Sequence, residues 1–316
     1  MHIARDLAEV PPDLGGPVVL ALGTFDGVHV GHRRVIGTAV ARARAINGKA
    51  AVVTFEPHPA EVLYPGGEPM LLTTLDERLA LLAQIGVDAA IVLPFDEQFA
   101  RMPAQTWLDE VLAARLRARE IVVGASYTFG HGREGTTERL AAWGRERGLA
   151  VHLVPAVRVD GEPVSSSRIR TAVRRGAVGA ATRLLGRRYS LRGPVVRGDG
   201  RGRTIGFPTA NLAPPARKVL PALGVYATSV ETGERRYGGA TNVGRRPTFG
   251  PREVTVETFL LDFDGDLTGR EIAVEFVERI REERAFAGVH ELVRQIATDV
   301  AQAQQLLARG GPSIIR

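Results

Sequence analysis

The chain has 316 residues, contains no cysteine and carries a formal net charge of +6, with 44% apolar and 24% charged residues. The length favours two domains, and the composition is typical of a soluble globular protein. The lack of cysteine excludes disulfides, thiolate catalysis, iron–sulfur clusters and thiolate-bound zinc.

Nearly all positive charge comes from arginine, because Lys49 and Lys218 are the only lysines. The arginines are scattered among acids, as in residues 270–284, and no basic block alternates with aromatic residues. This pattern argues against a nucleic-acid partner and suits an enzyme with polyanionic nucleotide substrates. We expect a cytoplasmic protein without membrane attachment, since neither a signal peptide nor a membrane-spanning apolar run is recognisable.

The first half of the chain alternates short apolar runs with amphipathic segments. Strands are predicted at residues 17–23, 50–55, 89–93 and 119–124. Helices are predicted after His32 and at residues 75–85 and 104–118. Alternation of strands and helices predicts a parallel sheet with helices on its faces.

The segment GTFDGVHVGH, residues 23–32, lies where a buried strand gives way to a helix, the position at which open α/β sheets bind ligands. His29 and His32 at a positive helix terminus suit the stabilisation of charge on an attacked phosphate. Gly27 and Gly31 allow close backbone approach. The alternatives are structural packing of two histidines and a two-histidine metal site lacking a carboxylate.

Two further segments of the first half contain residues that suit phosphate binding. In SSSRIR, residues 165–170, hydroxyls and free N–H groups at a helix start suit phosphates, unless the serine is only a helix cap. GHGREG, residues 130–135, fits the GxGxxG pattern of a nicotinamide or flavin oxidoreductase. Its first glycine lies well past the preceding strand, and no acid ends the next strand at residues 151–157, so we disfavour that function.

After about residue 186 the pattern changes to strand-like runs separated by Gly, Pro and Asp-Gly, with little helix between them. The runs cover residues 189–197, 223–230, 237–243, 254–263 and 271–278, and a helix from Val289 to about Leu307 follows. The sequence therefore predicts an α/β protein with two domains. We expect residues 1–186 to form a parallel α/β sheet domain and residues 187–316 to form an antiparallel β-barrel with a closing helix.

GRGRTIGFPTANL, residues 200–212, combines a glycine loop with a proline-fixed turn that carries Thr209 and Asn211. Two oxygen donors beside a phosphate loop suit Mg²⁺ or another hard divalent cation. The segment lacks the GK[ST] ending of a Walker A loop, and its alternative interpretation is an ordinary barrel turn.

Glu257 lies in the strand-like run VTVETFLLDF, where alternate residues share a face. Thr255, Glu257 and Phe259 should therefore point the same way. A carboxylate between apolar neighbours is a candidate for chemistry, and the alternative is a solvent-facing glutamate at the barrel rim.

Together with TFEPHP (54–59), LTTLDERLALLAQIGVD (72–88), PFDEQFA (94–100) and VGASYTFG (123–130), these motifs resemble the prokaryotic bifunctional riboflavin kinase/FMN adenylyltransferase family, or FAD synthetases. The resemblance spans nearly the whole chain. It implies a C-terminal riboflavin kinase domain that forms FMN with ATP and Mg²⁺. It also implies an N-terminal nucleotidyltransferase-like domain that adenylylates FMN to FAD and releases pyrophosphate. Riboflavin, FMN and ATP would be the partners, and no oligomeric state is implied.

The same resemblance assigns roles to individual residues. Glu257 would take or orient the proton of the riboflavin 5′-hydroxyl, and His29 and His32 would belong to the adenylyltransferase site. Nucleotide binding would involve Gly23, Phe25, Gly31, Ser126, Ser165, Ser166, Ser167, Arg170, Gly202, Gly206, Thr209 and Asn211. Flavin binding would involve Phe55, Pro57, Phe129, Asn242, Phe259, Arg281 and Phe286. The metal ligands would be Thr209 and Asn211.

Three residues depart from the family pattern. Ser126 replaces the usual Asn or Asp, Ser167 replaces the usual Thr, and Phe259 replaces a frequent His. Loss of one hydrogen bond at position 126 would weaken nucleotide binding by about 1 kcal/mol, so we expect slower adenylyl transfer. The alternative functions are a riboflavin kinase with an impaired or altered-nucleotide adenylyltransferase half, and a non-catalytic flavin-binding regulatory protein.

Overall fold

A computed structural model describes residues 1–64, 66, 70–198, 200–233, 235–245 and 254–310. Its contacts divide the chain into two compact units, Met1–Ser166 and Ser167–Arg316. Among the helices of these ranges, none is long and apolar enough to cross a membrane.

The division between the units precedes the change of sequence pattern at residues 186 and 187, because two helices between these positions pack on the barrel. They are α7 (Ser166–Arg174) and α8 (Val178–Leu185). The Ala222 N–H donates to the Val173 carbonyl over 3.3 Å, and α8 contacts two barrel strands.

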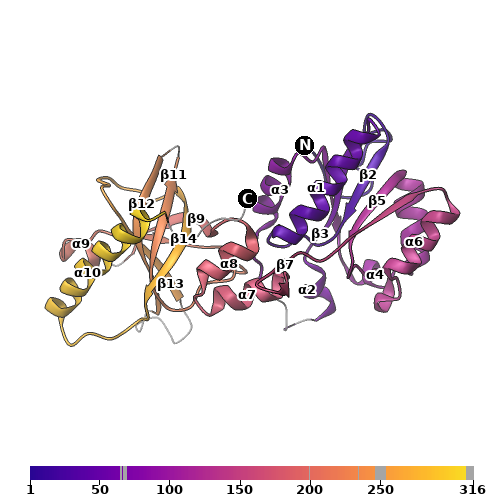
Figure 1. Ribbon diagram of the computed structural model, residues 1–316. Coiled ribbons are helices and arrows are strands. Elements are labelled where there is room, and N and C mark those ends of the chain that lie inside the picture. Colours follow the sequence, from indigo (N-terminus) through magenta and orange to yellow (C-terminus); the bar gives the residue numbers. More distant parts are fainter. Residues whose placement is uncertain (65, 67–69, 199, 234, 246–253, 311–316) are drawn as a thin grey trace. The chain divides into compact units, whose positions relative to one another are not determined.

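The first unit contains a six-stranded parallel sheet in the order β1-β4-β3-β2-β5-β6 (Figure 1). The strands are β1 (His2–Ala4), β2 (Val18–Leu22), β3 (Lys49–Glu56), β4 (Ala89–Pro94), β5 (Ala118–Gly124) and β6 (Ala150–Val154). A separate hairpin is formed by β7 (Arg158–Val159) and β8 (Glu162–Pro163). The parallel sheet and its predicted strands are confirmed.

Helices cover both faces of this sheet. They are α1 (Val30–Ala45), α2 (Pro59–Leu63), α3 (Leu75–Ile85), α4 (Glu97–Ala100), α5 (Ala104–Thr106), the π-helix η1 (Trp107–Arg115), the 3₁₀ turn η2 (His131–Arg133) and α6 (Thr137–Glu146). The single helix predicted at residues 104–118 is therefore α5 followed by a π-helix. This π-helix buries Trp107, Leu108, Val111 and Leu112.

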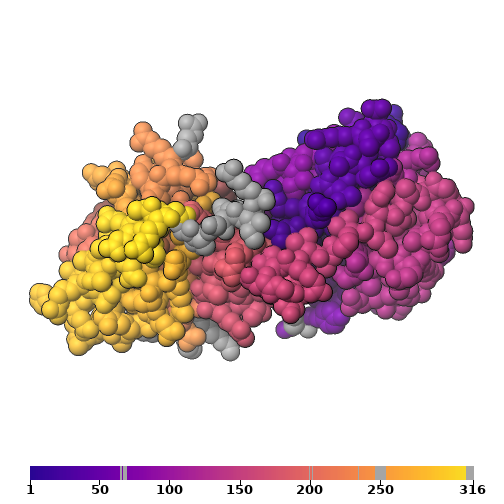
Figure 2. Space-filling view, viewed as in Figure 1, coloured from indigo at the N-terminus to yellow at the C-terminus, as the bar shows by residue number. Residues whose placement is uncertain are grey.

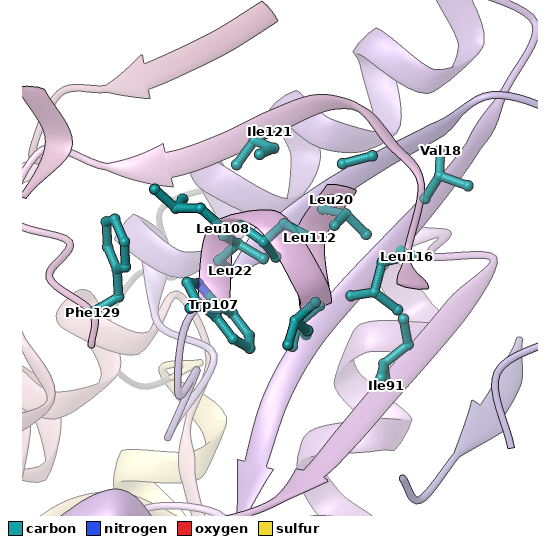
Figure 3. Close-up of a cluster of buried hydrophobic side chains, with 14 of the residues drawn as sticks. Val18, Leu20, Leu22, Ile91, Trp107, Leu108, Leu112, Leu116, Ile121 and Phe129 are labelled. Carbon is teal, nitrogen blue, oxygen red and sulfur yellow. The ribbon is translucent and has the colours of Figure 1, made fainter. Parts of the chain in front are cut away.

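The central strand β2 is buried on both faces, which explains its continuous apolar run. Leu20 and Leu22 belong to the cluster that includes Trp107 and Leu108 of the π-helix (Figure 3). Val19, on the opposite face, belongs to the cluster formed with α1 and α3. The core thus fixes β2 firmly, and with it the loop that follows β2.

The strand order places a topological switch point beside β2. The chain passes from β2 to β3 and β4 on one side, and then returns to β5 and β6 on the other side. Ligands of open parallel sheets bind outside the carboxyl ends of the strands at such a point. The segment at residues 23–32 follows β2 directly and lies at this position.

The second unit is a closed antiparallel barrel in the strand order β10-β13-β12-β11-β14-β9. The strands are β9 (Tyr189–Val196), β10 (Ala210–Leu212), β11 (Gly224–Thr232), β12 (Arg235–Arg245), β13 (Val254–Leu260) and β14 (Glu271–Arg281), and a short helix α9 (Arg201–Thr204) precedes β10. The predicted barrel is confirmed. The prediction of a turn at Asn211 is corrected, because residues 210–212 form strand β10. Three residues are too few to show the alternation of a strand in the sequence.

The closing helix α10 (Val289–Ala308) lies on the outside of the barrel (Figure 2, yellow). It contacts β11, β12 and β14, and Ala303 packs with Ala227, Ala240 and Val277. The helix thereby covers part of the outward face of these strands.

Candidate functional sites

The two histidines of the first unit are stacked at the start of α1. His29 is the N-cap residue, and its Nδ1 accepts a hydrogen bond from the backbone N–H of His32 over 3.2 Å. The ring centroids lie 3.5 Å apart at 18°, and the Phe25 ring meets His32 edge-on at 5.3 Å. The predicted placement at a helix start is confirmed, and two imidazoles lie beside the positive helix terminus.

The loop between β2 and α1, residues 23–29, ends at His29 and is hereafter called the histidine loop. Its backbone geometry is strained. Phe25 and Val28 adopt φ angles of 50° and 39°, in the left-handed region that non-glycine residues rarely enter. Such strain persists only where surrounding contacts impose it, and it clusters at functional sites. Gly23 begins the loop, and its N–H donates to the Val53 carbonyl over 3.2 Å.

Asp26 anchors the loop from inside. Its buried carboxylate accepts hydrogen bonds from the backbone N–H groups of Leu72 and Thr73, both over 3.0 Å, and from Thr73 Oγ1 over 3.1 Å. The Ser166 hydroxyl donates to the Asp26 carbonyl over 2.9 Å. The second predicted motif is therefore joined to the first by one of its serines.

The other predicted nucleotide-binding residues of this motif are placed as follows. Ser165 is exposed, while Ser167 and Arg170 lie on α7 and are counted with the second unit. Ser126 is exposed in the turn after β5, which is closed by a hydrogen bond from the Tyr127 N–H to the Gly124 carbonyl. Their contribution to nucleotide binding stays a prediction.

Aromatic rings gather at the end of β3 and in the segments that follow β4. Phe55, Phe95, Phe99 and Trp107 form ring pairs with centroid separations of 5.3–6.3 Å. Such a group offers apolar faces to a planar heteroaromatic ligand.

A second ring pair lies in the loop after β5. Tyr127 and Phe129 stack at 5.6 Å, and burial raises the pKa of Tyr127, so its phenol stays protonated at neutral pH. Phe129 is largely buried in the core cluster, whereas Pro57, after β3, is exposed. Flavin binding by these residues and by Phe55 stays a prediction.

The GHGREG segment forms the turn η2, and an isolated bridge joins Phe129 to Gly135. Helix α6 begins only at Thr137, after this bridge. A dinucleotide fingerprint opens its helix directly after the strand, so the segment lacks the required context.

In the barrel, three predicted site residues stand in one row across neighbouring strands. Asn211 on β10 pairs with Glu257 on β13, and Glu257 pairs in turn with Asn242 on β12. Thr255, Glu257 and Phe259 are half-buried and alternate with the buried residues Val256, Thr258 and Leu260, so the predicted shared face is confirmed. The row therefore stands on the outward face of the barrel wall.

The row lines a cavity of about 730 Å³ that also contains Thr209 and the glycine loop. Gly202 accepts a hydrogen bond from the Phe207 N–H over 2.8 Å, and Gly206 turns the chain with a φ of 86°. Gly198 passes so close to Asn211 that an added Cβ would overlap the side-chain amide nitrogen.

Phe259 contacts the GFPTAN motif directly. Its ring meets the Phe207 ring edge to face, with centroids 5.4 Å apart and an angle of 72°. The aromatic residue that departs from the family pattern thus packs against the motif that carries Thr209 and Asn211.

The cavity also contains charged groups that the sequence analysis did not single out. Asp264, Asp266, Arg197 and Arg203 line it. Hydrogen bonds from Thr268, together with the positive charges of both arginines, lower the pKa of Asp266 below its ordinary value.

Thr209 and Asn211 supply oxygen donors that fit a hard cation. Within the described ranges no group of three or more His, Cys, Asp or Glu side chains could hold a metal ion by itself. Mg²⁺ is commonly held by one or two protein oxygens, several waters and the substrate phosphates, so two neutral donors beside a glycine loop suit it.

Two further residues were predicted to contact flavin: Arg281 is the last residue of β14, and Phe286 lies between β14 and α10. Arg281 holds the buried Asp299 carboxylate with its Nε and Nη2, the shortest distance being 2.7 Å. Phe286 is half-buried between Arg281 and Arg284, whose guanidinium carbons lie 5.6 and 4.8 Å from the ring centroid. Their flavin contact stays a prediction.

Sequence reasoning missed Arg78, the largest fully buried side chain described. Arg78 is on α3 and shares a helical face with Leu75 and Leu82, so it is a charged residue on an apolar face. A charged residue on the apolar face of a helix could have been recognised in the sequence, because such a charge needs buried partners.

Comparisons with known proteins cover both units. Family models described as FAD synthetase and riboflavin kinase match residues 13–168 and 185–307. A bifunctional riboflavin kinase/FMN adenylyltransferase of Bacillus subtilis (strain 168) is 38% identical over 90% of this chain and 91% of its own length. One of Escherichia coli (strain K12) is 39% identical over 93% and 94%. A Streptococcus pneumoniae structure, described as a macrolide-efflux protein, is 34% identical with a TM-score of 0.88, covering 96% of this chain and 98% of that chain.

Proposed function

Because the chain belongs to the family of bifunctional riboflavin kinase/FMN adenylyltransferases, we propose that its two reactions take place at the two sites described above. The enzyme phosphorylates riboflavin to FMN with ATP and adenylylates FMN to FAD. We assign the first step to the barrel cavity and the second to the carboxyl edge of the parallel sheet. A cytoplasmic location, where ATP is available, fits both steps.

The cross-strand row of Asn211, Glu257 and Asn242 carries the kinase assignment. Glu257 takes or orients the proton of the riboflavin 5′-hydroxyl, so that this oxygen attacks the γ-phosphate of ATP and ADP leaves. Thr209 and Asn211 would hold Mg²⁺, which neutralises the charge on the phosphates when bound. The neighbouring glycine loop leaves room for those phosphates.

In the adenylyl transfer step, a phosphate oxygen of FMN attacks the α-phosphate of ATP, and pyrophosphate leaves. His29 and His32 stabilise the negative charge that builds up on the attacked phosphate, together with the helix terminus that His29 caps. Ser165, Ser166, Ser167 and Arg170 bind the triphosphate. The aromatic rings around Phe55 accommodate the flavin ring system.

Substitution of the base tests the assignment of the kinase step. Glu257→Gln keeps size and hydrogen-bonding capacity, and we expect riboflavin phosphorylation to fall by about 10²–10⁴-fold. FAD formation from supplied FMN should be unchanged, as measured by chromatographic separation of the flavins. Glu278→Gln, an exposed glutamate on β14, is the matched control. Near-normal FMN formation by Glu257→Gln would refute the assignment.

A further inference from the structure

Arg78 on α3 is a buried cation that neither assigned reaction uses. Its side chain is fully buried, and burial lowers the pKa of the guanidinium, although the carboxylates of Glu56 and Asp26 oppose that shift. An arginine in a protein stays protonated, and a buried charge is tolerated only with hydrogen-bonded partners. The placement of Arg78 therefore depends on the groups that surround it.

Those groups belong to the ends of two neighbouring strands. Nη1 donates to the Thr24 carbonyl at 3.1 Å, to Thr54 Oγ1 at 2.9 Å and to the Phe55 carbonyl at 3.0 Å. Nη2 donates to Glu56 Oε2 at 3.0 Å. The Thr54 hydroxyl in turn donates to the Thr24 carbonyl at 2.9 Å. One planar group thus joins the loop after β2 to the last residues of β3.

The turn before α3 holds the same loop from a second side. It supplies the Leu72 and Thr73 N–H groups to Asp26, and the Thr73 hydroxyl accepts a hydrogen bond from the Gly27 N–H at 2.9 Å. Residues 72–78 therefore contact the histidine loop on both sides of its strained Phe25. The LTTLDER segment, which has no role in the two assigned reactions, is the anchor of that loop.

We propose that Arg78 is a positioning residue for adenylyl transfer, which sets the histidine loop relative to the end of β3 where Phe55 stands. The proposal rests on the proposed roles of His29 and His32. A lysine offers a single point charge where arginine offers a fixed fork of donors, so Arg78→Lys cannot reproduce all four contacts. Because Arg78 holds the loop through its backbone, its loss should lower turnover more than substrate affinity.

The experiment compares Arg78→Lys with Arg101→Lys, a matched control whose exposed side chain lies in the same unit. We expect kcat for FAD formation from FMN to fall about 10–100-fold in Arg78→Lys, with KM for ATP and FMN changed less than about threefold. The riboflavin kinase rate of the same chain should stay unchanged. Fluorescence checks folding of the first unit, because both tryptophans, Trp107 and Trp143, belong to it.

A second variant tests the proposal through the partner group. Thr54→Val fills the same space but removes the hydroxyl between Arg78 and Thr24, and we expect a fall in kcat of about 3–10-fold. In the double variant the losses should not multiply, because both changes break one network. If Arg78→Lys does not fold, the kcat of Thr54→Val for FAD formation tests the proposal by itself.

Retention of kcat within twofold by the folded variants would overturn the proposal, as would a parallel loss of kinase activity. Independent, multiplying effects of the two substitutions would also overturn it. If His29→Asn left FAD formation intact, the proposed role of the histidines would fail, and this proposal would fail with it. If His29→Asn were inactive while Arg78→Lys was fully active, only the positioning role would be wrong.

Discussion

In the first unit the two histidines lie at a helix start beyond a strand end, whereas in the barrel Asn211, Glu257 and Asn242 lie on the paired strands themselves. The histidine loop is held by Asp26 and Arg78, whose partners are far away in the sequence. The row of Asn211, Glu257 and Asn242 follows the register of paired strands. The position of the histidines therefore depends on side chains that are distant in the sequence. The barrel site depends on which residues occupy the three paired positions.

The largest expected effect comes from a substitution that distinguishes the catalytic role of His29 from its role as the N-cap of α1. His29→Asn removes the imidazole but keeps a good N-cap for α1, so the helix start should persist. We expect FAD formation from FMN to fall about 10²–10³-fold, while riboflavin phosphorylation is unchanged. His29→Ala should lose the cap as well and destabilise the first unit by about 1 kcal/mol more. His2→Asn, at an exposed histidine of β1, is the control, and an equal loss there would contradict the prediction.

The second largest effect tests whether kinase activity depends on the position of Asn211 beside Glu257. Gly198→Ala would place a methyl group against the Asn211 side chain, which must move out of the row. We expect kcat/KM of the kinase for ATP to fall about 10–100-fold, without an effect on FAD formation from FMN. Gly288→Ala, where an added Cβ meets nothing within 4 Å, is the matched control. Steady-state kinetics at varied ATP would measure the change, and an unaltered kcat/KM would contradict the proposed position of Asn211.

The same contrast explains what the sequence could predict. The strands and helices that were predicted in both units followed from apolar periodicity, because burial on one or two faces imposes that period directly. Strand β1 and helices α6 and α8 were not predicted. The shared face of Thr255, Glu257 and Phe259 followed from strand alternation. Strand β10 escaped because three residues show no period, and the π-helix escaped because its apolar spacing resembles that of an α-helix.

Contacts between distant segments could not be derived from local pattern. The hydrogen bonds of Asp26 to residues 72–73 and of Arg78 to the ends of β2 and β3 depend on the packing of α3. The close approach of Gly198 to Asn211 depends likewise on the pairing of β9 with β10. Side-chain identity indicated candidate groups, and only the fold showed which groups hold which loop.

A smaller effect tests how tightly the histidines are placed. A Cβ at Gly31 would lie 3.1 Å from Cε1 of His29, so that ring must shift by a few tenths of an ångström. We expect Gly31→Ala to slow FAD formation about 5–10-fold without loss of helix stability, since alanine favours helix. Gly37→Ala on the same helix, where an added Cβ meets nothing within 4 Å, should stabilise the unit and leave activity intact. Equal activity of the two variants would show that the ring stacking is not needed.

The smallest expected effect concerns a carboxylate in the first unit that lies outside the site. A hydrogen bond from Arg42, together with one from His152, lowers the pKa of Glu120, which is largely buried at the start of β5. Because the folded pKa is depressed, this carboxylate stabilises the unit above its unfolded pKa of about 4.3, and the contribution is lost as pH falls through the folded pKa. Glu120→Gln should therefore lower the free energy of unfolding by about 1 kcal/mol at pH 7 and by progressively less below pH 4.

Tryptophan fluorescence during urea unfolding isolates this effect, because both tryptophans belong to the first unit. The exposed pair of Glu97 with Arg101 provides the control, since Glu97→Gln should change stability by less than about 0.5 kcal/mol at either pH. FAD formation at pH 7 should be unaffected by both variants. A loss of FAD formation in Glu120→Gln would show that the loops after β2 and β5 depend on contacts at the opposite end of the sheet. The adenylyltransferase site would then depend on distant residues other than Asp26 and Arg78.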